Sequence, residues 1–195
     1  MIVQPTSATS RNCPGPCKCP RHAQSNTYGT NLQYSGAASA ASLQGVPATA
    51  FSGVSGAQVS YTTLESDPDA ASTHAARIYS ALTVHFVDTL FHAGGGSPVL
   101  PPQVIVNVNY ASISNCSSPD DYEWVFTRNR RDTSAVDVQT CGSDHLPSET
   151  QVVLGKGCYA SVSAISATTK TDVDASTQAE VFEQLQGLPF SCYDS

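Results

Sequence analysis

Charged residues are scarce in this chain of 195 residues: they make up 13% of the sequence, and only nine are Lys or Arg. The formal net charge is −7. Proteins that bind nucleic acid depend on Lys and Arg to neutralise phosphates, so we expect no nucleic-acid partner. The chain also lacks any run of about 18 apolar residues, the length that a membrane-spanning helix needs, so we expect no membrane partner.

The common catalytic motifs are absent as well. The sequence contains no Gly-x-Ser-x-Gly nucleophile elbow, no phosphate-binding loop and no dinucleotide fingerprint. These absences exclude the most frequent cofactor-dependent enzymes. We therefore expect no cofactor, assign no catalytic residue, and favour a binding function over an enzymatic one.

What the chain does have is cysteine. Its seven cysteines are Cys13, Cys17, Cys19, Cys116, Cys141, Cys158 and Cys192. All seven are disulfide candidates, and one thiol is left over if the others pair. Their wide spacing suits cross-links better than a compact zinc site, and together with low charge and abundant Ser and Thr it predicts an extracellular protein. The start of the chain lacks the basic and apolar regions of a signal peptide, so secretion requires that the signal has been removed.

The amino-terminal part predicts an arm and a linker. Residues 12–20 contain three cysteines and three prolines, which excludes a helix or a central strand. Residues 35–56 are rich in Ser, Ala and Gly, a composition typical of linkers. We therefore expect residues 1–56 to be a Cys/Pro-rich arm and linker, and residues 57–195 to be a single globular domain.

Hydrophobic periodicity predicts the elements of that domain. Helices are expected at 70–93, ended by Gly94, and at 177–186, capped by Ser176 and closed by Gly187. Strands are expected at 103–110 and 122–127, with shorter ones at 58–63, 135–140, 151–154 and 158–165. This order predicts an α+β fold: a β-rich, mostly antiparallel sheet with one long and one short helix, stabilised by disulfides.

The histidines of the long helix are a possible metal site. His74, His85 and His92 lie near one helical line, but the rise per residue separates neighbours by roughly 16 and 10 Å. One metal ion cannot bridge these distances. We interpret the stripe as a solvated helix face and expect no metal.

Two acidic clusters flank the predicted elements. They are Glu65, Asp67 and Asp69, and Asp120, Asp121 and Glu123. Glycoside hydrolysis needs two carboxyl groups about 5 to 10 Å apart across a cleft, and each cluster could supply one. The same compositions are also typical of turns and helix caps, which is the interpretation we favour.

An aromatic strand beside an Asn-bearing strand is the best candidate for a binding site. The candidate residues are Trp124, Tyr122, Tyr110, Asn107 and Asn109. Aromatic rings can stack on the apolar face of a pyranose, while amide groups bond its hydroxyls. A lone Trp in a strand is also typical of a core residue, and the sequence leaves both interpretations open.

The sequence contains two further surface motifs. Asn115-Cys116-Ser117 is a formal glycosylation sequon, with which a disulfide at Cys116 would compete. The segment 128–131 contains three arginines and resembles a proprotein-convertase site. We interpret it as a solvated turn that offsets the acidic surface.

The last third of the chain carries a family resemblance. It runs from Asp121-Tyr122-Glu123-Trp124 through Cys141 to Gly157-Cys158-Tyr159-Ala160-Ser161, and continues in residues 169–179. This part resembles non-catalytic modules of fungal secreted polysaccharide-degrading enzymes, such as α-1,3-glucanases and chitinases. The resemblance implies a role at cell-wall polysaccharide and transfers no binding residue.

These observations lead to three hypotheses. The first is a secreted, non-catalytic, glycosylated accessory domain that binds polysaccharide or cell-wall glycan. The second is a small secreted glycoside hydrolase that uses one carboxylate from each acidic cluster. The third is an extracellular structural or assembly protein that joins a neighbouring subunit through the amino-terminal arm.

Overall fold

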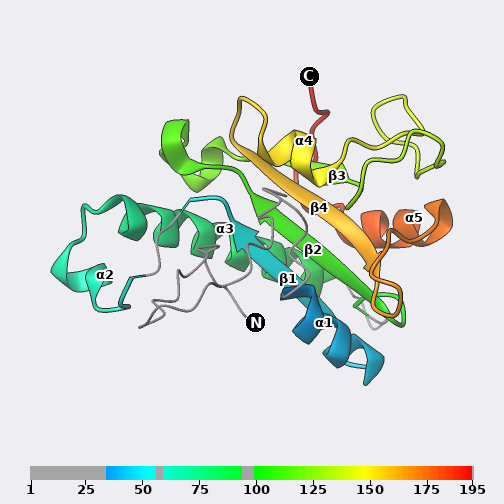
Figure 1. Cartoon of the computed structure of the whole chain (residues 1–195), viewed down its shortest axis with the longest axis horizontal. Helices are drawn as coiled ribbons and strands as arrows, with labels where there is room; N and C mark the ends of the chain where they lie inside the picture. The colour runs from blue at the N-terminus through cyan, green and yellow to red at the C-terminus, as the bar shows by residue number, and fades with distance from the viewer. Residues whose placement is uncertain (1–33, 56–58, 94–98, 195) are drawn as a thin grey trace, which may run out of the picture.

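The computed structural model describes residues 34–55, 59–93 and 99–194, which form a mixed four-stranded sheet with helices on both faces (Figure 1). The helices are α1 (Tyr34–Leu43), α2 (Thr63–Ser66), α3 (Ala71–Ala93), α4 (Glu149–Val153) and α5 (Ala175–Gln184). The strands are β1 (Ala48–Gly53), β2 (Val104–Tyr110), β3 (Glu123–Thr127) and β4 (Tyr159–Ser166). Two 3-10 turns, η1 (Ile113–Asn115) and η2 (Pro119–Asp121), precede β3.

The strand order is β1-β2-β4-β3. Strands β2 and β4 are antiparallel, whereas β1 pairs with β2, and β3 with β4, in parallel. The expected α+β fold is confirmed, but the expected mostly antiparallel, β-rich sheet is only partly met, because two of the three strand pairs are parallel. Helices contain more residues than strands. The connections from β1 to β2 and from β3 to β4 are long and include helices, and such crossovers join parallel strands.

One face of the sheet carries the main core. The predicted long helix is confirmed as α3, and its apolar stripe packs on this face. Its buried members are Ala75, Tyr79, Leu82, Phe86 and Leu90. From the sheet they meet Phe51, Val106, Val108, Tyr110, Trp124, Phe126 and Val162, while Val181 of α5 and its C-cap residue Leu185 extend the cluster. The sequence periodicity predicts this layer because large apolar side chains repeat at helical and strand spacing.

The other face is covered by α1 and α4. The predicted linker over residues 35–56 is wrong, because this segment forms α1 and the edge strand β1. Small side chains let α1 lie close to the sheet: Ala38 packs beside Ala50 and Ile105, and Ser42 Oγ donates to the Val104 carbonyl at 3.1 Å. A helix of Ala, Ser and Gly has the composition of a linker, which explains the error.

Several shorter predictions also need correction. The predicted strand at 151–154 is part of α4, because Ser148 and Gln151 form a capping box that starts a helix there. Within 58–63, the described residues make a turn that leads into α2, and residues 135–140 make only an isolated bridge at Thr140. Helix α5 begins two residues earlier than expected, capped by Asp174 instead of Ser176.

Two disulfides confirm the predicted cross-linking for four of the cysteines. Cys116 pairs with Cys158, and Cys141 pairs with Cys192. Cys13, Cys17 and Cys19 lie outside the described residues, as does most of the predicted arm.

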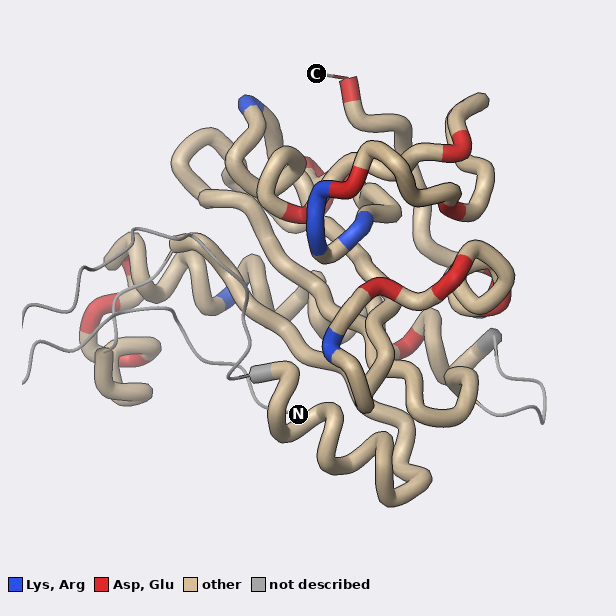
Figure 2. Tube along the Cα trace, turned by 45° about the vertical axis from the view of Figure 1, so that its right-hand side comes forward, with Lys and Arg blue, Asp and Glu red and all other residues tan. Residues whose placement is uncertain are grey.

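Acidic residues outnumber basic ones along the described trace (Figure 2). Helix α3, although it has 23 residues, is too polar to cross a bilayer. Within the described part of the chain, every other helix is shorter, and none meets the length and hydropathy of a membrane span.

Candidate functional site

The predicted aromatic residues lie inside the core and form no exposed platform. Trp124 is 2% exposed and packs against Phe86 and Tyr110. Tyr110 shares a hydrogen bond with Thr83, and Tyr122 donates to the Ala111 carbonyl at 2.9 Å. Burial raises the pKa of both tyrosines. These rings are therefore not available to stack on a sugar, and the core interpretation of Trp124 is the one that the structure supports.

Asn107 and Asn109 lie on the opposite face of the sheet, where they meet a residue that the sequence analysis missed. The Glu149 carboxyl group, at the start of α4, accepts hydrogen bonds from Asn107 Nδ2 at 2.7 Å and Ser163 Oγ at 2.7 Å. Asn109 also bonds to this carboxyl group, and Ser52 Oγ donates to Asn109 Oδ1 at 2.5 Å. The capping-box motif at 148–151 is the signal that would have placed Glu149 on a helix.

Glu149 is 7% exposed, and the side chains that donate hydrogen bonds to its carboxyl group are neutral. Burial raises its pKa to about 7, the nearby charge of Asp172 acts in the same direction, and the hydrogen bonds from Ser163, Asn107 and Asn109 oppose the rise. The hydrogen bonds of Glu149 to Asn107 and Ser163 hold α4 on the sheet.

A second buried network corrects part of the interpretation of the arginine segment: Arg130 and Arg131 are exposed, as predicted for a solvated turn, but Arg128 is not. Arg128 is buried and not solvated, and its guanidinium pairs with Asp137 and Asp172. Asp137 also accepts from Gln178 Nε2 at 2.8 Å and from the Leu146 N–H at 3.0 Å. These bonds fix the loop over residues 129–147 on the body of the domain.

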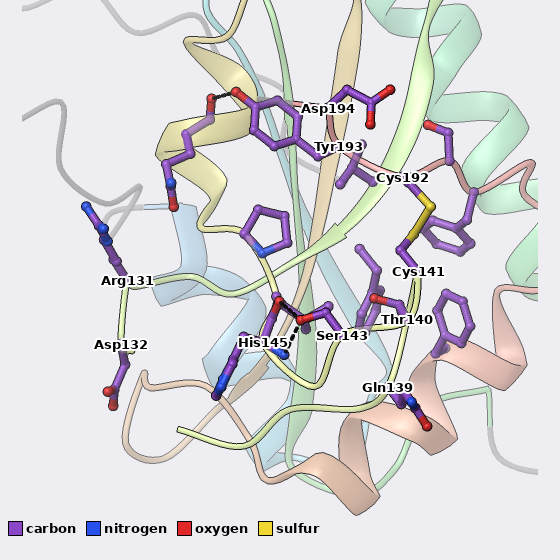
Figure 3. Close-up of a pocket in the computed structure, with 18 of the residues that line it drawn as sticks. Arg131, Asp132, Gln139, Thr140, Cys141, Ser143, His145, Cys192, Tyr193 and Asp194 are labelled. Atoms are coloured by element: carbon purple, nitrogen blue, oxygen red, sulfur yellow. Dashed lines mark hydrogen bonds between the residues drawn. A yellow bond between two sulfur atoms is a disulfide. The ribbon is translucent and has the colours of Figure 1, made fainter. Parts of the chain in front are cut away.

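That loop forms one wall of a pocket of about 830 Å³ at the free edge of β3. The opposite wall is the carboxy-terminal segment over residues 189–194, and the Cys141–Cys192 disulfide joins the two walls. Tyr193 donates its hydroxyl to the Gln151 carbonyl at 2.9 Å, which ties the segment to α4 (Figure 3). The pocket is therefore held by a disulfide, a hydrogen bond and the Arg128 network.

The rim of the pocket is polar. In Figure 3, Arg131 and Asp132 lie on one side, and Gln139, Thr140 and the disulfide lie on the other. Asp132 accepts hydrogen bonds from the Ser134 N–H at 2.9 Å and the Ser134 Oγ at 2.7 Å, which lower its pKa and fix its orientation.

The floor of the pocket is aromatic. Phe126 of β3, Phe182 of α5 and Phe190 pack with ring centroids 5.0 to 5.9 Å apart. Phe182 and Phe190 are only partly buried, and both line the pocket. An apolar floor beneath a rim of amide, hydroxyl and charged groups is the usual composition of a small-molecule or oligosaccharide site.

The other candidates from the sequence do not meet at the pocket. His74, His85 and His92 are exposed, as expected for a solvated face, and the described residues contain no cluster suited to a metal ion. Neither acidic cluster lines the pocket. Asp121 instead caps η2, where it accepts from the Ser117 and Ser118 N–H groups, so its predicted turn role is confirmed.

The sequon residue Asn115 is exposed, and its neighbour Cys116 is disulfide-bonded. Comparison with known proteins adds no further constraint: no family model, curated protein or solved structure matches the chain.

Proposed function

We propose that the protein is a secreted, non-catalytic domain that binds polysaccharide in the pocket beside the Cys141–Cys192 disulfide. The observation that carries this proposal is the combination of the phenylalanine floor with the polar rim. Pyranose rings have an apolar face and a hydroxylated edge, and this pocket offers a surface for each. The site differs from the one that the sequence predicts around Trp124.

Charge and covalent structure support the same proposal. A net charge of −7 disfavours polyanionic ligands and leaves neutral glycans as suitable ones. Disulfides persist in oxidising compartments, where polysaccharides of cell walls and matrices are found. The two alternatives gain less support, because the acidic clusters of the hydrolase hypothesis lie away from the pocket and the arm of the assembly hypothesis lies outside the described residues.

The test is retention of the protein on insoluble α-glucan, (1→3)-β-glucan, (1→4)-β-glucan and chitin. We expect at least one polymer to retain it, and Gln139→Ala at the rim to weaken retention. Gln44→Ala is the matched control, because Gln44 is exposed and does not line the pocket. Failure of all four polymers to retain the wild-type protein would contradict the proposal, as would equal retention of the two Gln variants.

A further inference from the structure

Strand β3 lies at the edge of the sheet, with β4 on one side only. The side of β3 that faces away from β4, its free edge, carries isolated bridges at its two ends, at Trp124 and at Arg128. At one end the Trp124 carbonyl accepts from the Ser191 N–H at 2.8 Å. At the other end the Arg128 N–H donates to the Pro147 carbonyl at 2.9 Å, and the Arg128 carbonyl accepts from the Glu149 N–H at 2.8 Å. Two separate segments therefore cover the ends of this edge.

Phe126 lies between these two paired positions. Peptide groups alternate in direction along a strand. Glu123 donates its N–H to Cys158, next to β4, whereas Trp124 and Arg128 bond outward. Phe126 has the same orientation as Trp124 and Arg128, so its N–H and its carbonyl both face the free edge. Among the described residues, neither group has a hydrogen-bond partner outside the ladder with β4.

This unpaired position is at the pocket. Phe126 lines the pocket and is only 3% exposed. Buried peptide groups are almost always hydrogen-bonded, by protein, water or ligand. The contents of the pocket are the remaining source of partners for the Phe126 N–H and carbonyl.

The spacing of these two groups defines what would fit them. Within one residue, three covalent bonds separate the N atom from the carbonyl O atom, through Cα and C. Three covalent bonds also separate the two oxygens of a vicinal diol. In an extended strand both peptide groups point the same way, so one sugar hydroxyl would accept from the N–H while its neighbour donates to the carbonyl.

We propose that the pocket recognises a vicinal diol of a sugar through the main-chain N–H and carbonyl of Phe126. This inference rests on the proposed glycan-binding function and names its ligand class. Chains linked 1→4 or 1→6 present free vicinal hydroxyls in every internal glucose unit. Linear 1→3-linked chains lack them, because the linkage uses the oxygen between O2 and O4. A peptide that binds by adding a strand needs several residues with unpaired peptide groups along the edge of a sheet. Here only Phe126 has such groups on the described edge of β3, so a peptide ligand is disfavoured.

The test compares retention on cellulose, which is 1→4-linked, with retention on curdlan, which is a linear 1→3-linked glucan. We expect at least about tenfold tighter retention on cellulose, because a ligand without the diol leaves the peptide groups unpaired. Periodate cleaves vicinal diols, so periodate-treated cellulose should lose retention by a similar factor.

A second measurement locates the contact without a mutation. Soluble cellohexaose at a concentration one hundred times its Kd should slow hydrogen exchange of the Phe126 amide roughly 100-fold. The Val108 amide of β2, a strand that does not line the pocket, serves as an internal control. Acetyl-tetraalanine amide tests the peptide alternative, and tighter binding of this peptide than of cellohexaose would overturn the proposal.

The outcomes separate the two proposals. Equal retention on cellulose and curdlan, or cellohexaose binding without slower Phe126 exchange, contradicts diol recognition and leaves glycan binding intact. Retention by none of the four polymers and no binding of cellohexaose contradicts both.

Discussion

The buried Glu149 carboxyl group should make the stability of the fold depend on pH in an unusual direction. The perturbation that isolates it is Glu149→Gln, which keeps the shape of the side chain and removes its ionisation. Because burial raises the pKa of Glu149 in the folded state, the folded protein binds this proton more tightly than the unfolded chain does. The resulting stabilisation is fully present below pH 4.5 and is lost as the pH rises through 7.

The magnitude follows from the two pKa values. A rise from 4.5 to about 7, at 1.36 kcal/mol for each unit, corresponds to about 3 kcal/mol. The free energy of unfolding of Glu149→Gln minus that of the wild type should therefore increase by about 3 kcal/mol between pH 4.5 and pH 8. Burial also raises the pKa of Asp172. Because Asp172 titrates in both proteins, its contribution to the pH dependence largely cancels in this difference.

The assay is urea unfolding followed by the fluorescence of the single tryptophan, Trp124, which is buried. Glu183→Gln is the matched control, because Glu183 is exposed on α5 and should leave the pH dependence of the wild type unchanged. Parallel pH profiles for the wild type and Glu149→Gln would refute the assignment of the raised pKa to Glu149.

Three further predictions concern stability. Replacing both Cys116 and Cys158 by Ser opens a loop with a sequence separation of 42 and should lower the free energy of unfolding by about 4 kcal/mol, which urea unfolding under oxidising conditions measures. Arg128→Met leaves Asp137 with an unpaired buried charge and should cost about 3 to 5 kcal/mol at pH 7, with a smaller loss at acidic pH; an equal loss at both would count against the ion pair. Trp124→Ala should lower the free energy of unfolding by about 3 to 5 kcal/mol, measured by thermal or urea unfolding. A variant of unchanged stability that no longer binds glycan would indicate instead that Trp124 contacts the ligand.

Much of the main core could be predicted from the sequence. The apolar stripe of α3 and the alternation in β2 and β3 consist of large apolar residues at regular spacing. The residues that this spacing places on one face are the ones buried in the structure. The helix α1 could not be predicted in this way, because its Ala and Ser side chains become favourable only through close contact with β1 and β2. Asn107 and Asn109 face α4 instead of solvent, because β2 is covered on both faces.

The candidate site depends on contacts that sequence patterns do not encode. The pocket walls come from residues 129–147 and 189–194, which the Cys141–Cys192 disulfide joins. Seven cysteines allow many pairings, so the partner of Cys141 cannot be deduced from spacing. The unpaired N–H and carbonyl groups of Phe126 likewise cannot be identified until the hydrogen-bond partners of β3 are known.

The most direct test of the pocket at the edge of β3 is to titrate ¹⁵N-labelled protein with cellohexaose and map the amide chemical-shift changes. We expect saturable changes at the residues that line the pocket, within 125–151, at Phe182 and within 189–194, and none on the exposed face of α3. Saturable changes centred on α3 or on α1, with the pocket amides unmoved, would contradict it.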